Sequence, residues 1–164
     1  MVRVGLVGCG TIGSRLAIAL QQDYGSCARV VALHDVEPLR ARALAKRLRL
    51  SPRSVSLPEL IRRSDLVLEA ASPAIAAEVA VRALRAHRKV FIMSVGGLLR
   101  DRSWQRMAAQ SRGQVYIPSG ALAGLDGVKA MALGRIRRVR LTTSKPPRAL
   151  ALAPYVQRKR LNLT

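Results

Sequence analysis

The sequence predicts an α/β fold in which a doubly wound parallel sheet is followed by the start of an incomplete α+β second domain. Two observations lead to this prediction. Short apolar segments alternate with segments of helical spacing along the first 117 residues, and the apolar segments carry hydrophobic side chains on both faces. Strands of this kind, separated by helices, form parallel sheets that are covered by helices on both sides.

The first elements follow from the spacing of apolar residues. Arg3–Val7 is a short apolar run that ends in glycines, and Ile12–Gln22 follows with apolar residues at helical spacing. Val30–His34 is another apolar run. Pro38–Leu50 has a proline near its start, where a helix tolerates it, and presents apolar residues on one face. These segments predict strand, helix, strand and helix.

The alternation then continues. Ser56 and Glu59 have the S-x-x-E spacing of a capping box, which begins a short helix through Arg63. The remaining predicted elements are, in order, a strand at Leu66–Leu68, an alanine-rich helix at Pro73–His87, a strand at Val90–Met93, a helix at Asp101–Ser111 and a strand at Gln114–Ile117. This order is typical of a doubly wound, dinucleotide-binding sheet.

The pattern changes after Ile117. Gly124–Leu133 predicts a short helix, and Arg135–Ser144 predicts a long strand because apolar residues alternate with arginines. Two prolines then break the pattern, and Arg148–Thr164 shows none. We therefore expect a binding domain over residues 1–118 and only the beginning of a second, catalytic domain over residues 119–164.

The charge of the chain is strongly positive. The formal net charge is +20, which usually indicates a polyanionic partner. The arginines are nevertheless spread over the whole chain, and aromatic residues, on which nucleic acid bases would stack, make up only 3%. A solvated basic surface is therefore the preferred interpretation, and a nucleic acid partner is not expected.

Targeting and redox signals point to the cytoplasm. No stretch of about 18 uncharged apolar residues predicts a membrane span, and the N-terminus lacks the pattern of a signal peptide. Cys9 and Cys27 do not make a disulfide framework. We expect a cytoplasmic protein with no membrane association.

A glycine motif carries the strongest local signal. Residues 8–13 read Gly-Cys-Gly-Thr-Ile-Gly, directly after the first strand and at the start of the first helix. In this context Gly8 allows a tight turn, Gly10 lets the backbone approach a pyrophosphate and Gly13 lets the helix pack on the strand, as in Rossmann-type domains. The helix N-terminus, with Thr11 and Ile12, would hold the phosphates. The alternative is a glycine-rich turn that binds nothing.

Asp35 stands 22 positions after Gly13, at the end of the second strand. A carboxylate here can accept hydrogen bonds from both hydroxyls of an adenosine ribose, and it would repel a 2′-phosphate. NAD is therefore favoured as cofactor, although NADP stays possible because Arg40 and Arg42 follow closely. Asp35 is also a candidate N-cap for the helix that begins at Pro38.

Small residues follow two further strands. Ala71 and Ser72 could border a cofactor, while Ser72 could equally cap the next helix, and residues 94–97 are a similar case. His34 and His87 lack the clustered ligands of a metal site, so no metal is expected. Cys9 is interpreted chiefly as a small packing residue.

Two specific segments, together with the glycine motif, carry a resemblance to a known family. They are Tyr-Ile-Pro-Ser-Gly-Ala-Leu-Ala-Gly-Leu-Asp-Gly-Val-Lys-Ala at residues 116–130 and Thr-Thr-Ser-Lys-Pro-Pro at residues 142–147. From Met1 to about Leu150 the chain resembles the L-aspartate dehydrogenase family. The resemblance implies an NAD(P)-dependent oxidoreductase that converts L-aspartate to iminoaspartate, which yields oxaloacetate and ammonia or enters NAD biosynthesis. It also implies a homodimer with a small-molecule substrate.

The resemblance assigns roles to residues. Gly10, Thr11 and Ile12 would hold the pyrophosphate, Asp35 the ribose, and Ala71 and Ser72 would border the cofactor. The family's pocket between the domains would contain Ser119 and Gly120 beside the substrate and Ala121 beside the cofactor.

Family members continue into a segment that contains the catalytic histidine, which neither His34 nor His87 matches, so no catalytic residue is assigned and a truncated member is expected. The alternatives are a non-catalytic NAD-binding module or pseudoenzyme, and a related dehydrogenase or reductase of the homoserine or dihydrodipicolinate type.

Overall fold

A computed structural model describes residues 1–49, 53–119, 125–142, 144–151 and 153–162. The chain divides into two compact units, Met1–Leu122 and Ala123–Thr164. Within the described residues, no helix is both long and apolar enough to cross a membrane.

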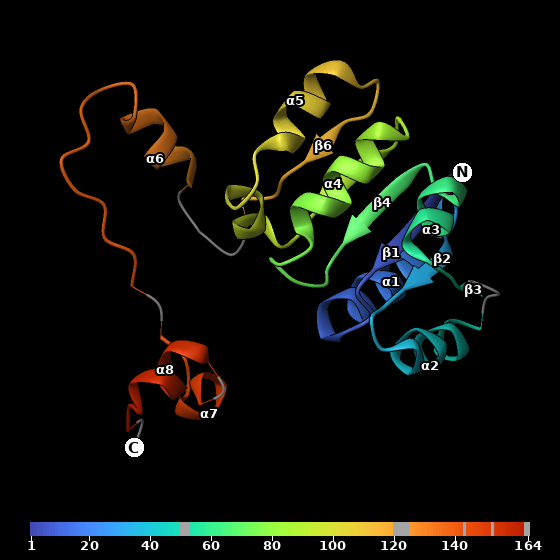
Figure 1. The fold of residues 1–164 in the computed structure, drawn as a ribbon, viewed down its shortest axis with the longest axis horizontal. Helices are drawn as coiled ribbons and strands as arrows, with labels where there is room; N and C mark the ends of the chain where they lie inside the picture. Colours follow the sequence, from blue (N-terminus) through green and yellow to red (C-terminus); the bar gives the residue numbers. More distant parts are fainter. Residues whose placement is uncertain (50–52, 120–124, 143, 152, 163–164) are drawn as a thin grey trace. The chain divides into compact units, whose positions relative to one another are not determined.

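The first unit contains a six-stranded sheet in the order β3-β2-β1-β4-β5-β6, in which every neighbouring pair is parallel (Figure 1). The strands are β1 (Val2–Val7), β2 (Ala28–His34), β3 (Arg53–Ser54), β4 (Leu66–Glu69), β5 (Lys89–Ile92) and β6 (Val115–Tyr116). The direction of winding reverses between β1 and β4, and ligands of such sheets bind beside the carboxyl ends of the strands at this switch point. The predicted doubly wound parallel sheet is therefore confirmed.

Helices cover both faces of this sheet. They are α1 (Thr11–Asp23), α2 (Pro38–Leu48), α3 (Leu57–Arg63), α4 (Ala76–Arg85) and α5 (Ser103–Gln110), with a 3₁₀ turn, η1 (Val95–Leu99), after β5. One aliphatic core joins the sheet to α1 and α2, and a second joins it to α3 and α4, with α5 packed against that core. Burial on both faces explains why the central strands are apolar throughout rather than alternating.

Helix α4 shows how the alanine-rich segment is used. Its buried residues are Ala76, Ala77, Val79, Ala80, Ala83 and Leu84. The helix begins at Ala76 rather than at the predicted Pro73, because residues 73–75 form a turn. The helix ends at Arg85, and His87, two residues later, has a backbone φ of 54° in the left-handed region, as is common just after a helix.

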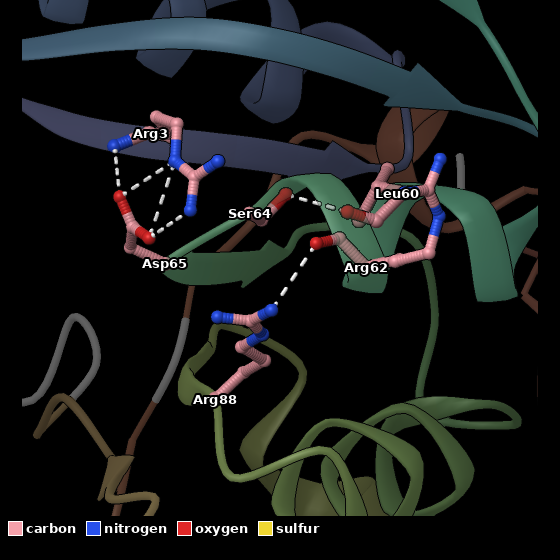
Figure 2. Close-up of polar contacts among 6 residues, drawn as sticks. All are labelled: Arg3, Leu60, Arg62, Ser64, Asp65 and Arg88. Carbon is pink, nitrogen blue, oxygen red and sulfur yellow. Dashed lines mark hydrogen bonds and ion pairs between the residues drawn. The ribbon is translucent and has the colours of Figure 1, made fainter.

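A polar cluster fixes β1 against β4 at the amino ends of the strands (Figure 2). The Arg3 backbone N–H donates to Asp65 Oδ2 at 2.9 Å, and Arg3 Nη2 lies 2.6 Å from Asp65 Oδ1. These hydrogen bonds from Arg3 lower the pKa of Asp65 to about 2. Ser64 Oγ donates to the Leu60 carbonyl at 2.7 Å, and Arg88 Nη2 donates to the Arg62 carbonyl at 3.2 Å. The contacts between Arg3 and Asp65 thus join the amino ends of β1 and β4, whose carboxyl ends form the site described below.

The second unit differs from the prediction. The predicted helix at Gly124–Leu133 is confirmed as α6 (Leu125–Met131). The predicted strand at Arg135–Ser144 is wrong, because its described residues form no strand and are exposed. An alternating pattern becomes a strand only where a neighbouring strand accepts its hydrogen bonds and covers one face. The α+β character predicted for this part is thus not seen in its described residues.

Two short helices follow where no pattern was recognisable. They are α7 (Pro147–Leu150) and α8 (Pro154–Lys159), and each has a proline at its start. Because proline is tolerated in the first turn of a helix, the two prolines are the feature of the sequence that could have indicated where α7 and α8 begin. Wherever burial is described between residues 125 and 162, the residues are exposed or half-buried.

Candidate functional site

A cleft opens where the carboxyl ends of β1, β2 and β4 meet. It offers about 160 Å³, roughly ten times the space that one water molecule needs. Its lining consists of Val7, Gly8, Gly10, His34, Asp35, Val36, Arg40, Ala70, Ala71, Ser72 and Ile75. This is the switch point of the sheet, where a ligand of a doubly wound fold is expected.

The three glycines of the 8–13 motif are required for three different reasons. Gly8 has a φ of +93°, and a Cβ there would lie 2.6 Å from the backbone of Ala71. A Cβ on Gly13 would lie 1.9 Å from the carbonyl oxygen of Gly8, so α1 could not pack against the loop. A Cβ on Gly10 would meet nothing within 4 Å. Packing therefore does not require glycine at position 10, and the missing side chain leaves open space in the cleft.

The N-terminus of α1 lies next to this open space. Gly10 is its N-cap residue, and no side chain caps this end of the helix. Thr11 and Ile12 are exposed in the first turn, and Ser14 Oγ donates to the Cys9 carbonyl at 3.0 Å. Backbone N–H groups in the first turn of a helix lack partners within the helix and carry a partial positive charge. They form a site suited to an anion such as a phosphate.

Asp35 connects the end of β2 to the glycine loop. Its Oδ2 accepts the Cys9 N–H at 2.7 Å, and its Oδ1 accepts the Glu37 N–H at 2.8 Å. The alternative role as N-cap of α2 is wrong, because Glu37 occupies that position. Each carboxylate oxygen can accept more than one hydrogen bond, so Asp35 can also accept hydroxyl groups from a ligand in the cleft.

The two arginines that follow Asp35 are placed differently. Arg40 lines the cleft, and its Nη2 lies 2.8 Å from Glu37 Oε1. Arg42 is exposed and is not among the residues that line the cleft. Only Arg40 is therefore positioned to affect which dinucleotide binds.

Ala71 and Ser72 both border the cleft, in the loop between β4 and α4. The interpretation of Ser72 as a helix cap is wrong, because α4 begins at Ala76 and Ile75 is the cap residue. The loop is instead held by Glu69, the last residue of β4, which the sequence did not single out. Its side chain is fully buried and accepts hydrogen bonds from the Ala71 and Ser72 N–H groups. A charged residue at the end of an otherwise apolar strand is the feature of the sequence that could have indicated a role for Glu69.

Cys9 is buried in the glycine loop, and its thiol lies 3.9 Å from the His34 carbonyl. Burial, assisted by the nearby Asp35 carboxylate, raises the pKa of the Cys9 thiol to about 12. A thiol with such a pKa is almost entirely protonated at neutral pH, and the thiolate is the reactive form. The interpretation as a packing residue is therefore favoured over a chemical role.

Cys9 is buried and Cys27 is exposed, so the two thiols should be modified at different rates. At pH 8 a colorimetric disulfide reagent should react quickly with exposed Cys27 and at least about 100 times more slowly with Cys9 in the folded chain. A Cys27→Ser variant should lose the fast phase alone. Two equally fast thiols in the folded wild-type chain would contradict the burial of Cys9.

The two histidines and the predicted substrate-pocket residues complete the comparison with the sequence. His34 lines the cleft, and its Nδ1 lies 2.9 Å from the Val55 carbonyl oxygen, whereas His87 contacts Ser111 Oγ at 3.2 Å. In the described part of the chain, no group of three or more His, Cys, Asp or Glu side chains could hold a metal ion. Ser119 is exposed, and Gly120 and Ala121 lie outside the described residues.

Comparisons with known proteins agree with this geometry. L-Aspartate dehydrogenase from Methanocella arvoryzae is 38% identical over 167 residues, a match that covers 99% of this chain and 61% of that protein. L-Aspartate dehydrogenase from Methanosarcina barkeri is 39% identical, with coverage of 96% and 59%. The chain thus spans about 60% of the length of these curated relatives. The resemblance drawn from the sequence motifs is confirmed.

Solved structures show the same fold at low sequence identity. UDP-N-acetylglucosamine 3-dehydrogenase from Acidithiobacillus ferrooxidans matches with a TM-score of 0.62 and 22% identity, over 83% of this chain and 43% of that one. Scyllo-inositol dehydrogenase from Lactobacillus casei also has a TM-score of 0.62, with 16% identity, over 80% and 41%. Residues 8–118 match the family model described as the NAD-binding domain of homoserine dehydrogenase. The glycine loop, the switch-point cleft and this match together show that the chain belongs to that family of NAD-binding domains.

Proposed function

We propose that the cleft binds NAD with its pyrophosphate at the N-terminus of α1 and its adenosine ribose at Asp35. The observation that carries this proposal is the open space beside Gly10, bordered by the uncapped helix end and by a carboxylate. Gly10, Thr11 and Ile12 would contact the phosphates, and Ala71 and Ser72 would border the rest of the cofactor.

The dehydrogenase proposed for this chain acts on L-aspartate. Bound NAD would accept the hydride from the α carbon of the amino acid, and the protein's part is to hold donor and acceptor close together. Support comes from the names of the curated relatives and from the segment at residues 116–130. Ser119, Gly120 and Ala121 are proposed beside the nicotinamide and the substrate, and residues 1–118 and 119–164 as the two domains. A homodimer in the cytoplasm completes the proposal.

The proposal is tested by adding NADH to the purified chain and following binding by fluorescence, then adding oxaloacetate and ammonia and following NADH absorbance. Binding with turnover supports the full proposal. Binding without turnover supports the cofactor site and favours a non-catalytic module or pseudoenzyme. Absence of NADH binding would contradict the proposed cofactor site and, with it, the proposed dehydrogenase activity.

A second substrate class is supported by the family model, which is described for homoserine dehydrogenase. The same purified chain with NAD and either L-aspartate or L-homoserine separates the two. NADH formation with homoserine and none with aspartate would replace the proposed substrate. The expected result is a preference for aspartate.

Asp35 provides a prediction about cofactor choice. Asp35→Ala should weaken NADH binding by about tenfold or more, because hydrogen bonds from the ribose to a charged acceptor are lost. NADPH binding should weaken much less, since the change also removes repulsion of the 2′-phosphate and leaves Arg40 in the cleft.

The Asp35 experiment needs a control for charge and for loop structure. Asp23→Ala removes the same charge at the exposed far end of α1 and should leave both dissociation constants unchanged. Asp35→Ala also removes the acceptor of the Cys9 N–H, so a general loss of loop order would weaken both dinucleotides. Equal losses for NADH and NADPH would therefore count against ribose recognition.

A further inference from the structure

Glu69 is the one fully buried carboxylate among the residues whose burial is described, and it lies at the end of β4, just before residues that line the cleft. Its exposed fraction is 0%. Burying a charge costs free energy unless hydrogen bonds satisfy it. The position of this charge therefore needs an explanation that the core alone does not provide.

The carboxylate is satisfied by three backbone N–H groups from two separate loops. Oε1 accepts the Ala71 N–H at 2.9 Å and the Ser72 N–H at 3.1 Å, both from the loop between β4 and α4. Oε2 accepts the Ser94 N–H at 3.0 Å, from the loop between β5 and η1. One side chain thus joins two loops that are separated by more than twenty residues of sequence.

The parallel pairing of β4 with β5 makes this link possible. Glu69 pairs with Ile92 at the carboxyl ends of the two strands, which brings Ser94 within reach of the side chain. The Met93 N–H donates to the Glu69 carbonyl at 2.9 Å and extends the same contact along the backbone. The loops are also tightly packed, because a Cβ on Gly97 would lie 2.3 Å from the Pro73 carbonyl oxygen.

The loop held by Glu69 forms the wall against which the glycine loop turns. The backbone of Ala71 lies so close to Gly8 that a Cβ on Gly8 would be 2.6 Å from it. Ala71 and Ser72 also line the cleft. A shift of this loop would therefore change both the shape of the cleft and the turn that precedes the anion-binding end of α1.

We infer that Glu69 is a positioning residue for the cofactor site: its buried carboxylate fixes the β4–α4 loop and the β5–η1 loop in the geometry that receives the dinucleotide. The inference rests on the proposed function, since it assumes that a dinucleotide occupies the cleft. Glu69 does not line the cleft, so it acts through the backbone of Ala71, Ser72 and Ser94.

The main test is Glu69→Gln, which keeps the size of the side chain but replaces one acceptor oxygen by a donor that faces N–H groups. NADH affinity, measured by fluorescence well below the melting temperature, should fall by roughly tenfold or more. The matched control is Ser64→Ala, which removes a buried hydrogen bond just before the other end of β4. The control should lower the melting temperature and leave NADH affinity unchanged.

A second variant and a direct measurement cover the case in which Glu69→Gln does not fold. Ser94→Pro removes one of the three donors and suits the observed φ of −83°, and it should weaken NADH binding by a smaller factor. In the unliganded wild-type chain, the Ala71, Ser72 and Ser94 amides should exchange hydrogen at least about tenfold more slowly than in an unstructured peptide.

The outcomes separate this inference from the proposed function. A wild-type chain that does not bind NADH contradicts the proposed function. A wild-type chain that binds NADH, with folded Glu69→Gln or Ser94→Pro variants that bind equally well, overturns the inference alone. Unprotected amides at Ala71, Ser72 and Ser94 would overturn it as well.

Discussion

A Gly10→Val variant is expected to fold and to lose NADH binding by a factor of about 100 or more. A Cβ at this position would have no other protein atom within 4 Å, so the fold leaves room for a side chain there. The same side chain would occupy the space proposed for the pyrophosphate. The backbone of Gly10, with φ of −73° and ψ of −163°, is an extended conformation that valine adopts readily.

The measurements for this variant are NADH titration by fluorescence and thermal unfolding by circular dichroism. Loss of glycine at a helix N-cap should cost about 1 kcal/mol, so a small decrease in melting temperature is expected. Ala109→Val adds comparable bulk on the exposed side of α5 and should change neither quantity appreciably. Unchanged NADH affinity in a folded Gly10→Val chain would contradict the proposal that the pyrophosphate binds at the N-terminus of α1.

The opposite result is expected at Gly13, three residues along the same motif. A Cβ there would lie 1.9 Å from the carbonyl oxygen of Gly8, which belongs to the backbone and cannot move away without distorting the loop. Gly13→Ala should therefore reduce the free energy of unfolding by about 3 kcal/mol or more. For a chain of this length the melting temperature should fall by roughly 10 °C.

Thermal and urea unfolding, followed by the fluorescence of the single tryptophan, Trp104, would measure this loss. The matched control is Gly96→Ala in η1, where an added Cβ would meet nothing within 4 Å. That change should alter stability by well under 1 kcal/mol. If Gly13→Ala were as stable as the control, the close approach of α1 to the glycine loop would be wrong.

The fold was predictable where burial alone determines an element. β1, β2 and β4 contribute buried residues to both cores, so their apolar runs identify them without knowledge of their neighbours. β3 has only two residues, which is too few to show any periodicity. The segment at residues 135–144 has the alternation of a strand, but its described residues pair with no neighbour, and pairing is a property of tertiary structure.

The site was predictable to a similar extent. The glycine motif and Asp35 have fixed sequence spacing, because they lie on consecutive elements of one β-α-β unit. Arg40 and Arg42 are equivalent in the sequence, and only the structure shows that Arg40 borders the cleft. Glu69 escaped prediction because its partner Ser94 belongs to the next strand, and the contact depends on the parallel register between β4 and β5.

The lengths of the strands have a consequence for solubility. The outermost strands of the sheet, β3 and β6, each have two residues, whereas β1 and β2 in the interior have six and seven. The margin of a sheet presents unpaired N–H and C=O groups that can recruit a strand from another molecule, and short marginal strands limit this form of aggregation. We expect copies of this domain to meet through side-chain surfaces rather than by extending one sheet into another.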